Sequence, residues 1–539
     1  MPGIEKLIAK GCAYLKKNGI KETAVRAYRK VLLGGPADYG KWLRKHCAGE
    51  EELERQRRDA SGKDDVLGVI ILKNDRCVKL QKDTPASLEA QTYGSLAVCS
   101  VPSGLSRYLL VEEGTYLRPE AVYVMMDHLG KHPETGLLYC DHDVADGNRS
   151  KDPFCKPEYD PVLLDQMNYI GTAAAVSAEL LEEKLKEDPD LLKRPVWEIW
   201  KALCRTAIVE RLPEILYSIP ACADARTDFR RPQTAPYHNL QADLQMPLQT
   251  DPRTSHHEAM QKDLPCLSVI IPNKDSIAEL TDCVKSFLSD GGWQNAEILI
   301  VENNSGQEET FAGYRRLQDE DERIRVLTWK KEFNYAAINN FAASEAKGEY
   351  LLFLNNDTKI RKKGAAAELM KWRSHPAFGA AGAALYYGDD TIQHGGVVLG
   401  YGGIAGHAFE GMPEAEYKKT WYAGAARQMS AVTGACMLVK KEVFLEAGGF
   451  TEELAVAYND IDLCMKIQSC GRMVIYDPAA ELYHFESRTR GLEMTREKAD
   501  RVNREAAYFC GRWKEELSRG DRFYSPNLTL EKPDFSLKR

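Results

Sequence analysis

Leu267-Ser-Val-Ile-Ile-Pro-Asn-Lys-Asp275 is the stretch that decides the fold, because a continuous apolar strand here ends in small polar residues. Such unbroken apolar runs are typical of strands that are buried on both faces of a parallel sheet. Three further apolar runs follow at 297–301, 325–327 and 349–354, and helical segments separate them. The alternation predicts a doubly wound α/β sheet.

Polar or acidic residues stand at the ends of three of these predicted strands. They are Pro272, Asn273 and Asp275 after the first strand, Glu302 after the second, and Asn355, Asn356 and Asp357 after the fourth. Because ligands bind at the carboxyl ends of strands in open α/β sheets, these residues predict a binding site. No glycine-rich phosphate loop is present, so a nucleotide bound here would need a metal ion to neutralise its diphosphate.

Composition restricts the class of protein. A chain of 539 residues predicts two or three domains. Its net charge of −8 offers no general attraction to nucleic acid. The sequence has no apolar run of the ~20 residues that span a bilayer and no secretory signal. The 14 cysteines form no CxxC pair, which favours reduced thiols in a cytoplasmic protein over a zinc or redox site.

The first half of the chain shows the same alternation after a helical start. Between residues 1 and 30, eight Lys and Arg accompany only two Glu, a basic face that either rests on anionic lipid or is simply solvated. Short strands are predicted at 69–72, 94–99, 108–111 and 136–139. The predicted organisation is a helical segment over 1–62, an α/β domain over 63–222, a polar linker over 223–263, a second α/β domain over 264–495, and a C-terminal helix and tail over 496–539.

The region from Leu267 to Gly491 resembles the family 2 glycosyltransferases of the GT-A fold, a Rossmann-like α/β architecture. Its closest resemblance is to the rhamnosyltransferase-like enzymes that build bacterial O-antigens, capsules and cell-wall polysaccharides. Eight segments carry the resemblance in the family's order: SVIIPNKD, ILIVENNS, FNYAAINNFA, YLLFLNNDT, HGGVVLGYGGIAGHAF, TGACMLVKKEVFLEAGGF, YNDIDLCMKI and ELYHFESRTRG.

The resemblance implies a metal site and a catalytic base. Asp357 stands in the family's DXD position, where Asn355 replaces the first acidic residue, and His484 matches a further metal or diphosphate contact. Mn²⁺ or Mg²⁺ suits such ligands. Asp460 is the implied base and Asp462 the second choice, although acids at this position can also cap the helix that they begin.

The resemblance also assigns residues to the two substrates. Those implied for the nucleotide are Pro272, Asn273, Asp275, Glu302, Asn334, Asn339 and Asn356, of which Asn334 and Asn339 are equally suited to cap or face solvent. Those implied for the sugar donor and the acceptor are His394, Gly395, Gly396, His407, Thr433 and Gly434.

The implied activity is that of a metal-dependent hexosyltransferase. It would move a sugar, with rhamnose a candidate, from a nucleoside-diphosphate donor to a glycan acceptor in bacterial surface polysaccharide assembly, with inversion. The acceptor in such pathways is generally lipid-linked, so we expect a cytoplasmic protein that contacts the inner face of the plasma membrane through its basic helix. The oligomeric state is left open. A nucleotidyltransferase and an inactive carbohydrate-binding scaffold are the competing interpretations.

The first α/β domain is predicted to be a degenerate copy of the second. Aligning 108–115 with 350–358, with one residue dropped, places Gly114 at the position of Asp357. A second alignment places Ser218 opposite His484 and Val196 near Asp460. We therefore expect a GT-A-like domain without transfer activity, in which Asp141 and Asp143 are the remaining candidates for metal binding.

Overall fold

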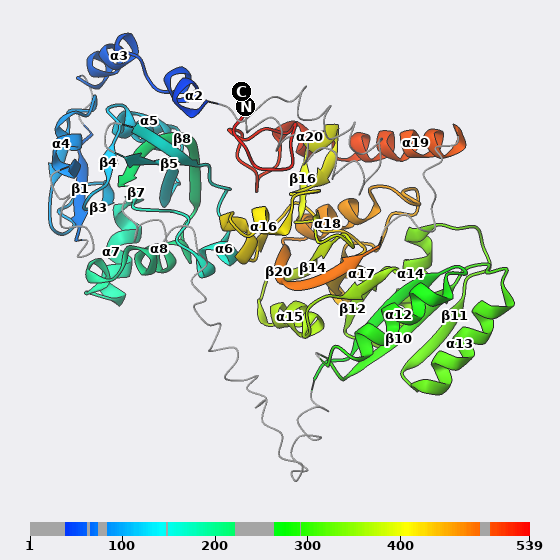
Figure 1. Cartoon of the computed structure of the whole chain (residues 1–539). Helices are drawn as coiled ribbons and strands as arrows, with labels where there is room; N and C mark the ends of the chain where they lie inside the picture. Colours follow the sequence, from blue (N-terminus) through cyan, green and yellow to red (C-terminus); the bar gives the residue numbers. More distant parts are fainter. Residues whose placement is uncertain are drawn as a thin grey trace, which may run out of the picture.

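The computed structural model describes residues 38–61, 65–73, 83–146, 149–220, 264–291, 293–485 and 496–539. Two α/β domains lie side by side in it (Figure 1), which confirms the predicted fold class. The basic stretch within residues 1–30 and the whole predicted linker, including His256 and His257, lie outside the described residues.

The first domain is built on one mixed sheet. Its strands are β1 (Leu67–Leu72), β2 (Leu96–Val98), β3 (Arg107–Glu112), β4 (Tyr116–Leu117), β5 (Leu137–Asp146), β6 (Arg149–Phe154), β7 (Ala173–Ser177) and β8 (Val209–Pro220). They are ordered β2-β1-β3-β7-β5-β8-β4, and β6 pairs with β5. The four strands predicted from apolar runs correspond to β1, β2, β3 and β5.

Helices precede and cover this sheet. They are α2 (Tyr39–His46), α3 (Glu50–Ala60), α4 (Asp83–Glu89), α5 (Ala121–Lys131), α6 (Pro161–Gln166), α7 (Ala178–Glu187) and α8 (Val196–Cys204), with a 3₁₀ turn at Leu191–Lys193. The part of the predicted helical segment that is described therefore is helical.

The second domain has a larger mixed sheet. Its strands are β9 (Leu267–Asn273), β10 (Ala296–Glu302), β11 (Ile324–Thr328), β12 (Tyr350–Leu354), β13 (Thr358–Ile360), β14 (Phe378–Tyr386), β15 (Ile392–His394), β18 (Arg427–Gln428), β19 (Cys436–Lys440) and β20 (Met473–His484). They are ordered β11-β10-β9-β12-β19-β14-β20-β13, with β15 on β14 and β18 on β20, while β16 (Val397–Leu399) and β17 (Ala405–His407) form a separate ribbon.

The helices of this domain are α12 (Ile277–Leu288), α13 (Glu308–Glu320), α14 (Tyr335–Glu345), α15 (Ala365–Met370), α16 (Glu414–Tyr417), α17 (Lys441–Glu446) and α18 (Asn459–Ser469), followed by α19 (Arg496–Arg512) and α20 (Lys514–Arg519). Short 3₁₀ turns occupy Lys371–Ser374, Tyr401–Gly403 and Trp421–Gly424.

The sheet is not wholly parallel. β19 runs antiparallel between β12 and β14. Its sequence, CMLVK, is nonetheless a short apolar run with four buried residues. Burial on both faces sets this pattern whichever way the strand runs, so an apolar run indicates a buried strand but not its direction.

The two sheets have matching topology. With β1 superimposed on β9, every strand of the first sheet has a counterpart of the same order and direction in the second, and β11 has none. From this match, the hydrogen-bonded pairs of neighbouring strands give the corresponding residues of the two sheets. Gly114 corresponds to Asp357, and Ile219 corresponds to His484. The sequence alignment was therefore one residue out at Ser218.

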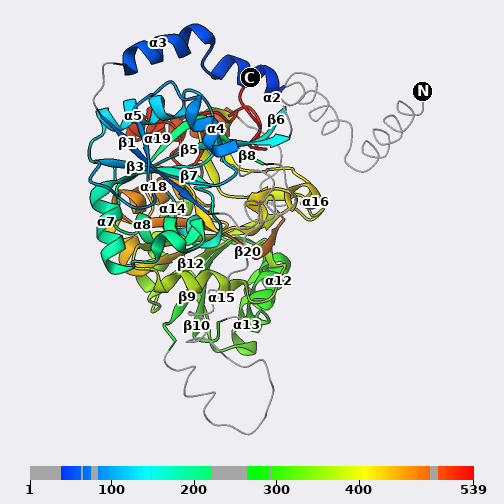
Figure 2. The same ribbon diagram turned by 90° about the vertical axis from the view of Figure 1, so that its left-hand side faces the viewer.

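The domains meet through α6 and through the C-terminal tail. The backbone N–H of Gln428 donates to the Asp160 carboxylate at 2.8 Å, and Phe154 packs edge-on against Trp421 with ring centroids 4.9 Å apart. Asn527 in the tail donates to Asp141 at 3.1 Å. In both views the C-terminus lies near α2 (Figures 1 and 2), so the tail spans from the second domain to the first.

Two predictions from composition can be compared with the described residues. Within them no helix is both long and apolar enough to cross a bilayer. The cysteines in the same ranges are free thiols, and several are fully buried.

Candidate active site

The carboxyl ends of β9, β10 and β12 lie together at one edge of the second sheet. Asn273 at the end of β9 pairs with Glu302 at the end of β10. Asn356, just after β12, donates to the Asn273 side chain at 2.7 Å. Residues that are up to 83 positions apart in sequence thus form one connected group, as the strand-end rule predicts.

Glu302 supports this edge from within. Its carboxylate accepts hydrogen bonds from the backbone N–H and the hydroxyl of Ser305 and from the Tyr314 hydroxyl, and only 4% of the residue is exposed. Tyr314 also receives a hydrogen bond from Asn273 at 2.7 Å. Glu302 therefore fixes the loop after β10, and a solute at this edge would meet that loop rather than the Glu302 carboxylate.

Asp275 joins the first two loops to one another. One of its oxygens accepts the N–H groups of Gly306 and Gln307 at 2.9 and 3.0 Å. Asp275 and its neighbour Ser276 have φ values of 52° and 37°, in the left-handed region that residues other than glycine seldom adopt. Such strain persists only where the surroundings hold it, and it concentrates at functional sites.

A carboxylate and an imidazole converge at the end of β12. Asp357 lies after β12 and His484 ends β20, and Asp357 Oδ1 is 3.2 Å from His484 Nε2. Asn355 Nδ2 lies 3.2 Å from the same imidazole nitrogen. The side chains of Asp357 and His484 are 14% and 10% exposed, so a small ion can reach them. The three residues predicted as metal ligands are therefore brought together.

The His484 ring is held in position by Gln393. Gln393 Oε1 lies 2.7 Å from His484 Nδ1, the imidazole nitrogen that does not face Asp357. Gln393 is 2% exposed and its neighbour His394 is fully buried. A hydrogen-bond partner on the second imidazole nitrogen is the usual support of a metal-binding histidine.

Asp460 lies across β19 from this pair. It is in the first turn of α18, and its Oδ2 accepts the N–H of Gly434 at 2.9 Å. The next residue, Ala435, accepts the backbone N–H of Asn355 at 3.0 Å. Asp460 and Asp357 are therefore linked through two adjacent residues at the start of β19, at the same edge of the sheet. Asp460 is also partly exposed, as a group that takes up a proton must be.

Asp462 lies in a different environment. It is fully buried, and its carboxylate accepts hydrogen bonds from Thr451 and Trp513 at 2.6 and 2.9 Å. Lys466 and Arg512 lie 3.2 and 3.4 Å away. This carboxylate holds α18 against the segment that follows α19, and it has no access to a solute.

Asn334 and Asn339 also have structural partners. Asn334 is the N-cap of α14: its side chain accepts the N–H of Ala337 at 3.0 Å and donates to the Glu452 carbonyl at 2.8 Å. Asn339 is fully buried and donates to the Tyr335 carbonyl. The prediction that these asparagines contact a nucleotide disagrees with these positions, and the helix-capping alternative describes Asn334.

The residues assigned to the sugar donor and acceptor fall into a buried and an accessible set. His394 is fully buried, which lowers its pKa well below the usual value, and its Nε2 accepts the N–H of Thr433 at 3.4 Å. Gly395 and Gly396 are buried as well, and the Gly395 carbonyl accepts from Arg427. His407 and Thr433 remain partly exposed, so only they offer side chains to a ligand.

Some residues that support the site were not predicted. Gln393, Ser305 and Tyr314 position His484 and Glu302 through side-chain hydrogen bonds. Gln393 directly precedes a segment of the motif series, and Ser305 ends another, so their places in the series were available as a signal. Tyr314 lies in the middle of α13, where a single tyrosine gives no signal.

The equivalent edge of the first domain contains an internal ion pair. Arg118 donates to Asp143 at 2.7 Å, and this carboxylate also accepts from Tyr39 at 2.6 Å and from Ser218. Burial and the neighbouring Asp143 raise the pKa of Tyr39. Because the guanidinium already neutralises Asp143, a metal ion there would have to displace it. Asp141 instead accepts a hydrogen bond from the amide of Asn527. Both candidates for metal binding in this domain therefore already have protein partners.

Comparison with known families gives a match within the second domain. Residues 268–444, from β9 to α17, match the family described as Glycosyl transferase family 2.

Two curated relatives match most of this chain. The uncharacterized protein y4gI of Sinorhizobium fredii is 32% identical over 452 residues, which are 79% of this chain and 49% of that protein. The O-antigen biosynthesis protein RfbC of Myxococcus xanthus is 34% identical over 425 residues, which are 76% of this chain and 32% of that protein. The chain thus spans half or less of the length of these relatives.

A solved structure is similar at lower identity. The mannosyltransferase PcManGT of Pyrobaculum calidifontis, in complex with GDP-Man and Mn²⁺, has 16% sequence identity and a TM-score of 0.34. The match covers 52% of this chain and 70% of that one.

Proposed function

We propose that the second domain transfers a sugar from a nucleoside-diphosphate donor to a hydroxyl of a glycan acceptor, with inversion at the anomeric carbon, in bacterial surface polysaccharide assembly. The observation that carries this proposal is the placement of Asp357 and His484 on one side of the first residues of β19 and of Asp460 on the other. The family match of residues 268–444 and the similarity to an O-antigen biosynthesis protein support it.

The ligand set at the end of β12 fits a divalent cation. A carboxylate oxygen and an imidazole nitrogen lie 3.2 Å apart, and Gln393 holds the other imidazole nitrogen in place. Asp357 and His484 would hold Mn²⁺ or Mg²⁺, with Asn355 beside them, and the ion would supply positive charge for the leaving diphosphate. The substitution of Asn355 for an acidic residue removes one negative charge from this ligand set.

Asp460 is the proposed catalytic base. A partly exposed carboxylate can accept the proton of the acceptor hydroxyl as that oxygen attacks the anomeric carbon from the face opposite the leaving diphosphate. The N–H groups of Gly434 and Ile461 fix the two carboxylate oxygens of Asp460. Asp462 is assigned a structural role, because every contact it makes is internal.

The nucleoside is proposed to lie over the loops that follow β9 and β10. Asn273, Asp275 and Glu302 fasten these loops to each other and to Asn356, which creates a rigid floor at the strand ends. Pro272 precedes Asn273 at the same edge. His407 and Thr433 are the accessible side chains on the sugar side of this floor.

The first domain is proposed to be a copy that has lost its ligand set. The matched strand order supports this, since the sheet registers put Gly114 and Ile219 at the positions of the metal ligands. Counting back from Val209 of β8 and Val474 of β20, which the sheet registers match, puts Pro195 at the position of Asp460, next to the predicted Val196. None of these three side chains can bind a cation or accept a proton. The domain instead braces the active one through Asp160 and Asn527.

The identity of the donor and of the acceptor rests on the motif series. Rhamnose is the proposed sugar and a lipid-linked oligosaccharide the proposed acceptor, because the segments resemble those of rhamnosyltransferase-like enzymes. Contact with the inner face of the plasma membrane is proposed through the basic residues 1–30. Flotation of the protein with anionic liposomes, with and without residues 1–33, tests this contact.

The test of the activity is incubation with a panel of nucleotide sugars, Mn²⁺ and an acceptor glycan. We expect release of a nucleoside diphosphate and transfer or hydrolysis of the sugar, with loss of diphosphate affinity in Asp357→Ala. Release of pyrophosphate would instead identify a nucleotidyltransferase. Binding without turnover for every donor and metal would identify a scaffold.

A further inference from the structure

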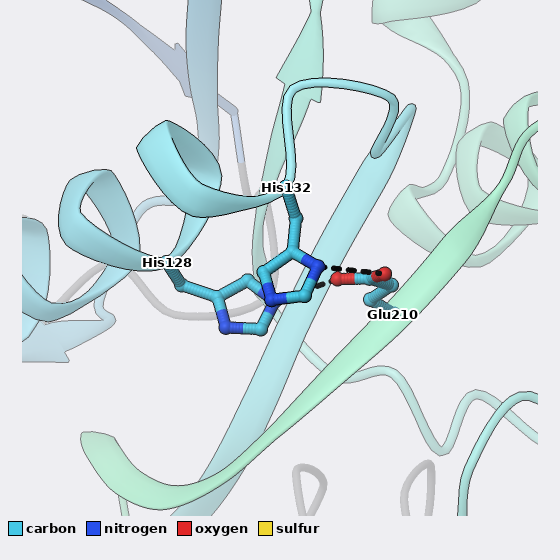
Figure 3. Close-up of side chains that lie close together, drawn as sticks. All are labelled: His128, His132 and Glu210. Carbon is cyan, nitrogen blue, oxygen red and sulfur yellow. Dashed lines mark hydrogen bonds and ion pairs between the residues drawn. The ribbon is translucent and has the colours of Figure 1, made fainter.

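The first domain contains a cluster of metal-ligating side chains far from its ion-paired sheet edge. His128 and His132 lie one helical turn apart near the end of α5, and Glu210 lies on β8 opposite them (Figure 3). One ligand atom from each residue can be chosen so that all three lie within 4.8 Å of one another. Among the described residues, no other group of three or more His, Cys, Asp or Glu side chains meets this criterion.

The ligand atoms of the cluster lie within metal-binding range of one another. His128 Nε2 lies 2.6 Å from one oxygen of Glu210, and His132 Nδ1 lies 3.7 Å from the other. The two imidazole rings are stacked with centroids 4.4 Å apart and 17° between their planes. Ligand atoms in a tetrahedral zinc site lie about 3.3 Å apart, given metal–ligand distances of about 2.0–2.1 Å. Because an imidazole binds a metal in the plane of its ring, at least one of the two stacked rings has to rotate before both nitrogens face one ion.

A fourth ligand is within reach. Glu134 Oε1 lies 3.7 Å from His132 Nδ1, the same nitrogen that faces Glu210. The side chains of His128 and Glu210 are 23% and 26% exposed, and that of His132 is 44% exposed. An ion can therefore enter from solvent, and either Glu134 or water can complete the coordination.

The second domain has an apolar contact at the corresponding place. The sheet registers match Ile475 of the second domain with Glu210 of the first. Ile475 is fully buried in the core that also contains Met370 of α15. In the first domain the end of α5 and the start of β8 thus carry three polar side chains, in addition to the apolar core that the two elements share. Polar side chains at such a joint contribute little to packing, so their convergence calls for a different source of stability.

We propose that His128, His132 and Glu210 bind a divalent transition-metal ion of the Zn²⁺ type that fastens the end of α5 to β8. Imidazole and carboxylate ligands suit zinc, and His128 in the last turn of α5 lies beside His132 at the C-cap of that helix. The ion would be structural, because this joint lies at the edge of the sheet opposite to the strand ends that carry Asp143. The proposal is independent of sugar transfer by the second domain.

The test is a titration of the metal-stripped full chain with Co²⁺, followed by visible absorption and by the number of ions bound. Wild type, Asp357→Asn, His132→Ala and Glu210→Gln are compared, with Asp127→Ala as a matched control. Asp127 lies on the same helix and pairs only at the surface with Lys131, 2.7 Å away. Thermal unfolding in EDTA shows whether each variant folds as wild type does.

We expect Asp357→Asn and Asp127→Ala to keep one tightly bound ion with tetrahedral absorption, and Zn²⁺ to raise their unfolding temperature. In His132→Ala and Glu210→Gln the affinity of this site should fall by at least about 10-fold, the smallest loss seen when even an outer partner of a metal ligand is removed. Equal affinity in His132→Ala and wild type, or loss of all bound ions in Asp357→Asn, would overturn the proposal.

Discussion

Replacing Asp460 with asparagine tests the proposed chemistry most directly. The amide keeps the size of the carboxylate and one acceptor for the N–H groups of Gly434 and Ile461, each now 2.9 Å from an oxygen. The other N–H turns to water at this partly exposed position, so we expect a stability loss of about 1 kcal/mol. Removing a general base lowers kcat by about 10²–10⁴, which corresponds to about 3–5 kcal/mol in activation free energy.

The assay is release of nucleoside diphosphate under saturating donor and Mn²⁺, with unfolding followed by circular dichroism. A loss of about 1 kcal/mol leaves a protein of ordinary stability almost wholly folded, so misfolding cannot account for a hundredfold lower rate. The KM for the donor should stay within a few fold of wild type, because Asp460 lies on the acceptor side.

Asp462→Asn is the matched control, two residues away on the same helix. It is fully buried and close to two cations, Lys466 and Arg512, so removing its charge should cost about 3–5 kcal/mol of stability. The rate per folded molecule should change little. The reasoning is refuted if Asp460→Asn retains wild-type kcat, or if Asp462→Asn loses rate at unchanged stability.

Three further predictions concern residues around the site and between the domains. Gln393→Ala should raise the Mn²⁺ concentration needed for half-maximal activity about 10–100-fold, and saturating Mn²⁺ should restore kcat, since only the orientation of the metal ligand is lost. Burial raises the pKa of Asp160 to about 6, so the folded protein holds a proton that the unfolded chain releases, and stability falls as pH rises from about 4 through 6. This pKa shift corresponds to a stability difference of roughly 3 kcal/mol between low and neutral pH. Asp160→Asn should remove this pH dependence, measured as the unfolding temperature at pH 4.5 and 7. Gly348→Ala would place a Cβ 2.6 Å from the backbone nitrogen of Ser268, and we expect about 1–3 kcal/mol lower stability in urea, whereas Gly306→Ala, where the space is open, should be nearly neutral.

The two similar sheets carry different side chains at the same edge. Arg118 lies beside Asp143 in the first domain, where the second domain brings Asp357 and His484 together. The guanidinium already pairs with this carboxylate. The matching fold is retained because the apolar strands that build the sheet are independent of the polar residues at their ends.

The sequence predicted those parts of the molecule that depend on local pattern. Apolar runs such as 267–271 and 350–354 locate the central strands because a strand that is buried on both faces must be apolar wherever it occurs. Polar residues directly after them locate the site, since parallel strands bring their carboxyl ends to one edge. Asp357 and His484, 127 positions apart, were paired by their places in the motif series.

Contacts between distant residues were decided only in the folded chain. The sequence implied Asp460 as the base and left Asp462 as the second choice, and burial beside Trp513 separates the two. It could not reveal that Gln393 holds His484 or that β19 runs antiparallel. Periodicity records which residues face a core, but hydrogen-bond partners and strand direction depend on how segments of the chain cross in space. The sequence alone determined an α/β chain with polar strand ends, and the tertiary structure decided which of those polar groups meet.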